Sequence, residues 1–258
     1  LFGLDKGHFI IGDCMSLSDL TREFFRQLQE MGQFKLNLLF ANLSIVIMVS
    51  GYLDYFTGHQ SVEALFFLLF TWYFATHSIT HPTFFVEDEV YDRTLISVIQ
   101  SRKSLVSVLL LKIIVQMLID LVKAIPLFLL IAFVMKVPFN HGVAGSLLIF
   151  LLCFVVIFGL YGMGLGFAGF SLLYSRTSSV TGLISYFMLF FTGILTQSTN
   201  LVLTYLFPYQ YLRSFILQPN LATASILSLY AIIYWVIGLL VFYALFSHAK
   251  KKGAIFNV

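Results

Sequence analysis

Charged side chains are scarce in this chain. Asp, Glu, Lys and Arg make up 10% of its 258 residues, whereas apolar residues make up 59%. Soluble domains usually carry about 25% charged residues, so a soluble domain of this length would lack the charge to cover its surface. The formal net charge of +3 is too small to indicate nucleic-acid binding. The composition therefore predicts an integral membrane protein in contact with a lipid bilayer.

Cysteine is also scarce, and one common nucleotide-binding motif is missing. The two cysteines, Cys14 and Cys153, lie in a polar stretch and an apolar run respectively, which does not indicate a disulfide. The sequence contains no G-x-x-x-x-G-K-[ST] loop, the phosphate-binding motif of many ATPases. We therefore expect no ATPase activity and no resident cofactor in this chain.

Long apolar runs dominate the sequence and predict transmembrane helices, because a helix needs about 20 residues to cross about 30 Å of hydrocarbon. The expected fold class is an all-α integral membrane protein with six transmembrane helices, of which the fifth is the shortest. Residues 1–33 precede the transmembrane domain, which covers residues 34–247, and residues 248–258 form a basic tail. The predicted spans are Phe34–Tyr55, Val62–Phe85, Ser104–Met135, Ala144–Leu173, Thr181–Thr196 and Ala222–Ser247.

An amphipathic pattern precedes the first span. Between Leu17 and Lys35, apolar residues recur on one side of a helix, and charged residues fall largely on the other side. Arg26 and Glu30 are four residues apart, a spacing that allows an ion pair along such a helix. The pattern predicts a helix lying along the membrane surface. An ordinary soluble helix is the alternative.

Lysine and arginine are distributed unevenly between the loops. With six spans, both termini share one side, and most of the 15 Lys and Arg residues lie on that side. Only Lys136 and Arg213 fall on the opposite side, and Lys112 and Lys123 lie within a span. Because loops rich in these residues stay in the cytoplasm, both termini are expected to be cytoplasmic. The Phe-, Ile- and Leu-rich composition favours a bacterial plasma membrane.

Charges concentrate between the second and third predicted spans, in residues 86–103. So many charges cannot lie in hydrocarbon, and we expect a water-facing turn on the cytoplasmic side. We interpret this charged segment as a docking element for a soluble partner, with a solvated loop as the alternative. Its charged residues are Glu87, Asp88, Glu89, Asp92, Arg93, Arg102 and Lys103.

A polar stripe lies within the third predicted span. Lys112, Gln116, Asp120 and Lys123 fall within about 80° of one another on a helical wheel. A charge at the middle of the bilayer costs about 2.5–3.5 kcal/mol, so the stripe must face protein or water, and an ion pair between Asp120 and Lys123 would offset part of that cost. Two interpretations stay open: a surface of the translocation path or coupling region, and a structural ion pair near the interface.

Small residues recur on one side of the fourth predicted span. Gly159, Gly162, Gly166 and Gly169 are spaced so that another helix backbone could approach closely. We interpret them as a packing surface. A ligand-binding role is the less favoured alternative, since glycines within a transmembrane helix do not form a phosphate-binding loop.

The fifth span is followed by two apolar pieces that are each too short to cross a membrane, within residues 197–220. Pro208 separates the pieces, and Arg213 and Pro219 lie further along. This pattern predicts an external re-entrant helical hairpin between the fifth and sixth spans. Such irregular backbone is tolerated at membrane depth only where protein or a watery cavity covers it.

Four features occur in order: the surface helix, the charged segment, the short fifth span with its re-entrant stretch, and the aromatic-then-basic ending Phe246–Lys252. Within the charged segment, the pattern Glu87-x-Glu89-x-x-x-Arg93-Thr94-Leu95 is similar to Glu-Arg-Glu-Arg-Gly-Thr-Leu. Together these features resemble the membrane subunit of a type 2 ABC exporter. Arg93 stands where that family has glycine, the acidic residues lie further from it, and residues 100–103 replace a turn that commonly contains proline.

The resemblance implies an ABC transporter permease that works with a separate ABC ATPase subunit, which would bind ATP and Mg. A second copy or a homologous permease subunit would complete the pathway, and closure of the ATPase would move the spans between inward-facing and outward-facing states. The 29 Phe and 13 Tyr residues favour an amphipathic or lipophilic substrate, such as a peptide, drug, lipid or polyketide. The resemblance assigns coupling to Glu87, Asp88, Glu89, Asp92, Arg93, Thr94 and Leu95.

An intramembrane metalloprotease of the prenyl-protein protease type is one alternative. His77 and His81, with Asp88-Glu89-x-x-x-Arg93, faintly resemble its motifs. That family needs histidine ligands on later helices, and only His141, in an outer loop, and His248, beyond the last span, follow. A metal site therefore lacks ligands, and we expect neither catalytic residues nor a metal.

A secondary transporter without an ATPase is the other alternative. Such transporters commonly show internal repeats with broken helices near the middle of the membrane. Comparison of residues 34–135 with residues 144–247 shows no convincing repeat. This alternative is therefore less favoured than the exporter.

Overall fold

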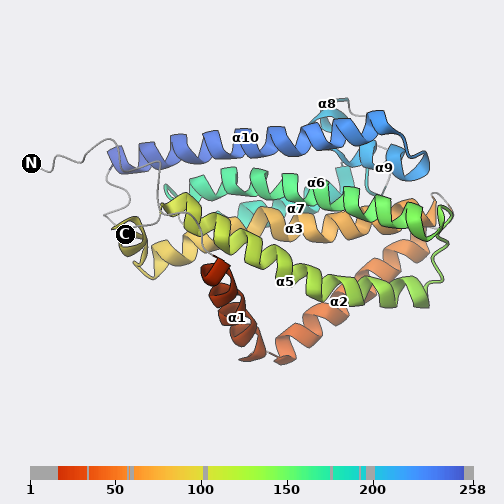
Figure 1. Cartoon of the computed structure of the whole chain (residues 1–258), viewed down its shortest axis with the longest axis horizontal. Coiled ribbons are helices and arrows are strands. Elements are labelled where there is room, and N and C mark those ends of the chain that lie inside the picture. Colours follow the sequence, from red (N-terminus) through yellow and green to blue (C-terminus); the bar gives the residue numbers. More distant parts are fainter. Residues whose placement is uncertain are drawn as a thin grey trace, which may run out of the picture.

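The structure, a computed structural model, describes residues 17–33, 35–56, 58, 61–100, 104–174, 177–191, 193–195 and 201–252. Every regular element in these ranges is an α-helix, as the sequence predicted. Four long helices, α3, α5, α6 and α10, run along the long axis of the molecule (Figure 1). The elements are α1 (Leu17–Gln33), α2 (Lys35–Phe56), α3 (Val62–Tyr91), α4 (Leu95–Gln100), α5 (Leu105–Val134), α6 (Gly142–Ser171), α7 (Ser178–Phe191), α8 (Leu201–Leu206), α9 (Tyr209–Leu217) and α10 (Leu221–Lys251).

Five helices are long and apolar enough to cross a membrane: Leu38–Phe56 within α2, and the whole of α3, α5, α6 and α10. They correspond to five of the predicted spans. The remaining one, Thr181–Thr196, falls on α7, whose 14 residues give a length of about 21 Å. That length is less than the hydrocarbon core, and Thr192 and Thr196 lie outside the described residues. A sixth crossing therefore stays a prediction.

Local sequence explains where three of the long helices begin. The hydroxyl of Ser104 accepts a hydrogen bond from the Ser107 amide at the start of α5, at 3.1 Å. Asn220 Oδ1 accepts one from the Thr223 amide at the start of α10, at 2.7 Å, and Ser61 caps α3 in the same way. Such side chains satisfy backbone donors that a helix leaves unpaired at its first turn.

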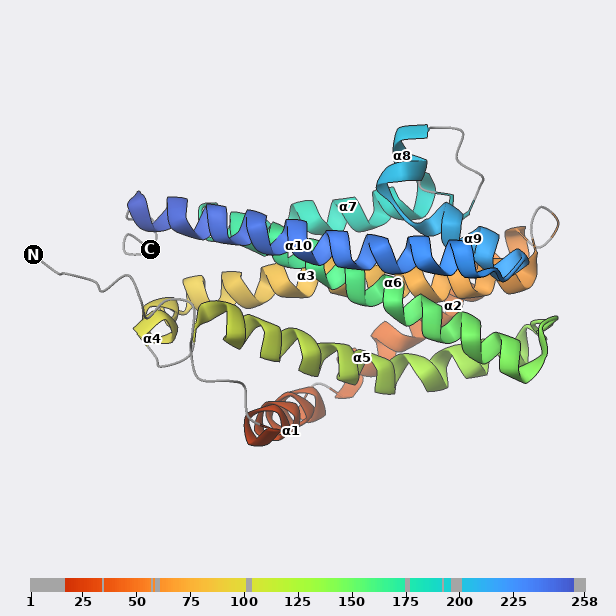
Figure 2. The same ribbon diagram turned by 45° about the horizontal axis from the view of Figure 1, so that its top comes forward.

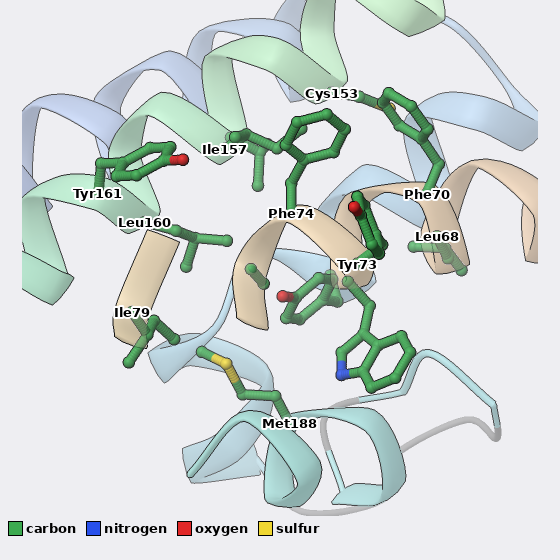
Figure 3. Packing of buried hydrophobic residues seen from close by; sticks show 14 of the residues in the cluster. Leu68, Phe70, Tyr73, Phe74, Ile79, Cys153, Ile157, Leu160, Tyr161 and Met188 are labelled. Carbon is green, nitrogen blue, oxygen red and sulfur yellow. The ribbon is translucent and has the colours of Figure 1, made fainter. Parts of the chain in front are cut away.

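Helix α3 forms the centre of the bundle. Every residue from Glu63 to Ala75 is buried, and α3 packs against α5, α6, α7 and α9. This part of α3 is apolar on nearly all sides, which is typical of a helix enclosed by others. Figure 3 shows Phe70 and Phe74 of α3 lying among side chains of α6, with Met188 of α7 on another side.

The structure shortens the turn expected in the charged segment. Helix α3 continues past Phe85 to Tyr91, because nothing in this stretch breaks the helix. Only Asp92, Arg93 and Thr94 form the turn, and α4 follows it directly. Arg102 and Lys103 lie outside the described residues. Three of the charged side chains, Glu87, Asp88 and Glu89, therefore project from a helix that extends from the apolar bundle.

The predicted glycines of α6 all face α10, and a Cβ atom added to Gly159 or Gly162 would lie only 2.7 Å from its backbone. A Cβ atom added to Gly238 of α10 would lie 1.9 Å from the carbonyl oxygen of Gly162. Gly164, which the sequence analysis did not single out, makes a comparable approach to Ser78 of α3. In the order Gly159, Gly162, Gly166 and Gly169, the nearest residues of α10 are Ala231, Trp235, Gly238 and Leu245.

The short helices occupy different parts of the molecule. Helix α1 is steeply inclined to the four long helices and packs against α5 (Figure 1). Arg26 pairs with both Glu23 and Glu30, and its hydrogen bond to Glu23 lowers the pKa of that carboxyl. Helices α8 and α9 lie at the end of the bundle opposite α4 (Figure 2). A position of α1 on the membrane surface and a re-entrant path for α8 and α9 both stay predictions.

Replacing Gly238 with alanine tests the contact between α6 and α10. The added Cβ would meet the Gly162 carbonyl, which is helix backbone and cannot move alone. We expect Gly238→Ala to lower the free energy of unfolding by about 1–3 kcal/mol, the usual cost of overpacking. The measurement is the melting temperature in detergent. Gly51→Ala in α2 is the control, because nothing lies within 4 Å of its added Cβ, and equal melting temperatures would contradict the contact.

Candidate functional site

The charged segment and the polar stripe meet around one cleft. The cleft has a volume of about 520 Å³ and is lined by residues of α1, α3 and α5, with Asp92 and Thr94 of the turn. The sequence predicted the two polar groups separately, and the structure brings them together. The charged side chains that line the cleft are Arg26, Glu30, Asp88, Glu89, Asp92, Lys112 and Lys123.

Asp120 of the polar stripe has no solvent exposure. Its Oδ1 accepts a hydrogen bond from Gln116 Nε2 at 2.9 Å and lies 2.7 Å from Lys123 Nζ. The hydroxyl of Tyr161, on α6, donates to Oδ2 at 3.5 Å. A buried carboxylate is tolerated when its oxygens are paired and hydrogen-bonded. The Asp120–Lys123 pair suggested by the spacing is therefore formed, together with a contact to a second helix.

Lys112, the first residue of the stripe, connects to the charged segment. Its Nζ lies 2.7 Å from Glu89 Oε1, with both side chains less than one-fifth exposed. The same ammonium group lies 5.7 Å from the centre of the Phe85 ring. The other oxygen of Glu89 accepts a hydrogen bond from the Thr94 hydroxyl. Glu89 thus connects the turn to α5. It joins the charged segment to the polar stripe, which were predicted from the sequence as separate features.

Glu87 makes a second connection, to α7. Its Oε1 accepts hydrogen bonds from the Ser178 amide at 2.7 Å and from the Thr177 hydroxyl at 3.0 Å. The carboxylate therefore caps the first turn of α7, where negative charge is favourable. Glu87 was predicted as a docking residue, and the structure shows it engaged with the chain itself. Nothing in the spacing of the sequence indicated this partner.

The turn itself is exposed and tightly held. Asp92, Arg93 and Thr94 are exposed, and Tyr91 before them is 85% exposed. Arg93 has φ 58°, in the left-handed region that glycine adopts most readily. This is the position at which the resembled motif has glycine, so the backbone supports that alignment. Leu95, the last predicted coupling residue, is buried and anchors the start of α4 instead.

Two histidines of α3, which the sequence suggested as metal ligands only under the protease alternative, join the site. His77 Nδ1 lies 2.9 Å from His81 Nε2 and 3.4 Å from Asp120 Oδ2. Their i,i+4 spacing was the available signal in the sequence. That Asp120 lies opposite them depends on the packing of α3 against α5.

The residues predicted for the external hairpin lie far from this cleft, at the other end of the bundle. Pro208 precedes α9, Arg213 lies within α9 and is 8% exposed, and Pro219 lies between α9 and α10. His141 Nε2 is 2.7 Å from the Ile216 carbonyl oxygen and connects the start of α6 to α9. The structure therefore separates these residues from the coupling residues.

A family model described as ABC-2 type transporter matches residues 18–218, which is more than half of the chain. No curated protein and no solved structure matches the chain. The matched range includes the charged segment, the polar stripe and the glycines of α6. The chain therefore belongs to the ABC-2 type transporter family and is a membrane permease subunit of an ABC transporter.

Proposed function

We propose that this permease works in an ATP-driven exporter and receives force from a separate ABC ATPase subunit through the turn Asp92–Thr94. One observation carries the proposal: the turn is exposed, while the helix that bears it is bonded to two other helices. A partner that presses on the turn would therefore move α3, together with the helices bonded to it, and not a flexible loop alone. ATP and Mg would bind to the partner subunit.

Exposure identifies the residues that are available to the ATPase. Tyr91, Asp92 and Arg93 are exposed, as is Asp88 one turn earlier. Glu87 and Glu89 are engaged with α7 and α5. The proposed contact is therefore narrower than the seven residues that the resemblance assigned. An exposed surface with both signs of charge suits an interface in which electrostatic complementarity selects the partner.

The two glutamates provide routes from the turn into the bundle. Glu89 bonds Lys112, near the start of α5, and Glu87 bonds the first turn of α7. Hydrogen bonds to charged groups are stronger than those between neutral groups and hold a defined geometry. In the proposed mechanism, a displacement of the turn is transmitted along α3 and, through these two bonds, to α5 and α7. Rigid-body movement of this kind is a common form of transition between two states.

The family and the sequence support the remaining parts of the proposal. The end of the bundle with the charged segment would face the cytoplasm of a bacterium, which agrees with the distribution of lysine and arginine. A second copy of this chain, or a homologous permease, would complete the translocation pathway. An amphipathic or lipophilic substrate, moved out of the cytoplasm, agrees with the many aromatic residues.

Charge reversal at Arg93 tests the contact with the ATPase. We expect Arg93→Glu to reduce recovery of the ATPase subunit that co-purifies with the wild-type chain by about tenfold, the effect of losing a favourable interface charge. Arg93→Gly keeps the left-handed backbone but removes the charge, so an intermediate loss is expected. Lys136→Glu is the control, because Lys136 is also exposed with a positive φ but lies at the opposite end of α5. Full recovery with Arg93→Glu would refute the contact.

Glu87 tests the route to α7 separately from partner binding. In Glu87→Ala, the Ser178 amide loses an acceptor whose hydrogen bond is worth about 1.5–3 kcal/mol, so exchange of this amide with deuterium should quicken by roughly tenfold or more. Because Glu87 is not in the proposed contact, the ATPase subunit should still co-purify.

Asp88→Ala, which alters the exposed neighbouring carboxylate, is the matched control and should leave exchange in α7 unchanged. Unaltered exchange in Glu87→Ala would show that this carboxylate does not hold the start of α7. In the complete transporter, we expect the amount of substrate moved per ATP hydrolysed to fall in Glu87→Ala.

A further inference from the structure

Three side chains that could bind one metal ion converge beside the cleft. Each of His77, His81 and Asp120 offers one ligand atom, and these atoms all lie within 4.8 Å of one another. Two of them lie one turn apart on α3, and the third comes from α5. The cluster therefore spans two helices, α3 and α5, between which the proposed mechanism transmits movement.

We propose that His77, His81 and Asp120 form a binding site for a divalent transition-metal ion of the Zn²⁺ class. Zinc binds histidine nitrogen and carboxylate oxygen at about 2.0–2.2 Å in tetrahedral geometry, which places neighbouring ligand atoms about 3.3 Å apart. His77 Nδ1 is 2.9 Å from His81 Nε2 and 3.4 Å from Asp120 Oδ2. Small side-chain rotations would bring the set to the required spacing.

The two oxygens of Asp120 have separate roles in this site. Oδ1 is occupied by Gln116 and Lys123, which hold the carboxylate in place. Oδ2 lies 3.4 Å from His77 Nδ1 and accepts a long hydrogen bond from Tyr161, at 3.5 Å. An oxygen held only by two long contacts can turn a lone pair to a cation, and groups that orient a ligand from behind commonly strengthen metal binding. Lys123 is cationic and works against the metal, so binding is expected to be reversible.

The cleft provides a route to the cluster and a fourth ligand. His81 lines the cleft together with Gln116 and Lys123. The volume of the cleft, about 520 Å³, has room for water. Water would complete the tetrahedral coordination, as it does where a protein supplies three ligands. Asp88 and Asp92, at the end of the cleft near the turn, would raise the local concentration of cations. A metal was not expected from the sequence because only histidines were counted as further ligands.

Zinc binding to the purified full-length chain tests the proposal directly. The chain is prepared in detergent without a polyhistidine tag, and binding of Zn²⁺ is measured by equilibrium dialysis. We expect one saturable Zn²⁺ site per chain, and an affinity at least about tenfold lower in His77→Ala and in His81→Ala. His248→Ala is the matched control, because His248 is exposed at the far end of α10 and should leave binding unchanged.

A second variant keeps the test decisive if the histidine variants fold poorly. Lys123→Gln removes the competing cation from Asp120, so Zn²⁺ should bind more tightly and raise the melting temperature more than in the wild-type chain. Wild-type affinity in both histidine variants, or unchanged affinity in Lys123→Gln, would overturn the proposal.

The expected effect on transport rests on the proposed function, whereas the binding does not. A metal that joins α3 to α5 should slow ATP hydrolysis by the complete transporter in the wild type and not in His81→Ala. Because dialysis uses the isolated chain without an ATPase, loss of binding and loss of coupling can be told apart.

Discussion

The Asp120 carboxylate has no solvent exposure, and leaving such a charge without partners would cost on the order of several kcal/mol. Its oxygens are therefore surrounded by Lys123 and Gln116 on its own helix, by His77 on α3 and by Tyr161 on α6. Because these groups come from three helices, the need to pair one carboxylate determines how the helices meet beside the cleft. The histidine cluster and the Glu89–Lys112 bond lie next to this arrangement.

The helices of the bundle are held together by two kinds of contact, in different parts of the molecule. Helices α6 and α10 approach so closely that Gly162 and Gly238 leave no space for a Cβ atom, and such contacts tolerate little sliding. At the end near the turn, α3 is joined to α5 and α7 by single polar side chains, Glu89 and Glu87. These polar bonds hold the helices at single points, whereas the glycine contacts hold α6 against α10 over several turns. In the proposed mechanism, the pair α6–α10 would act as a fixed support for the other helices.

The sequence predicted the polar features of the site but not the partners of their individual side chains. The charged segment and the stripe from Lys112 to Lys123 were both visible, since a local excess of charge in an apolar chain needs no structure to be noticed. Glu87 and Glu89 were grouped with the exposed Asp92, because residues so close in sequence look alike without knowledge of their neighbours. His77 and His81 were set aside because only histidines were counted as further ligands, and their third possible ligand, Asp120, is a carboxylate on a different helix.

The sequence by itself determined the helical class, five of the membrane-crossing segments and the starts of helices at Ser61, Ser104 and Asn220, because length, hydropathy and capping act over a few neighbouring residues. It also contained the features of the ABC-2 type transporter family. Only the tertiary structure decided that Glu87 meets α7, that Lys112 meets Glu89 and that Asp120 meets His77. Those contacts join residues distant in the chain, and they depend on how whole helices cross and rotate against one another, which no local pattern encodes.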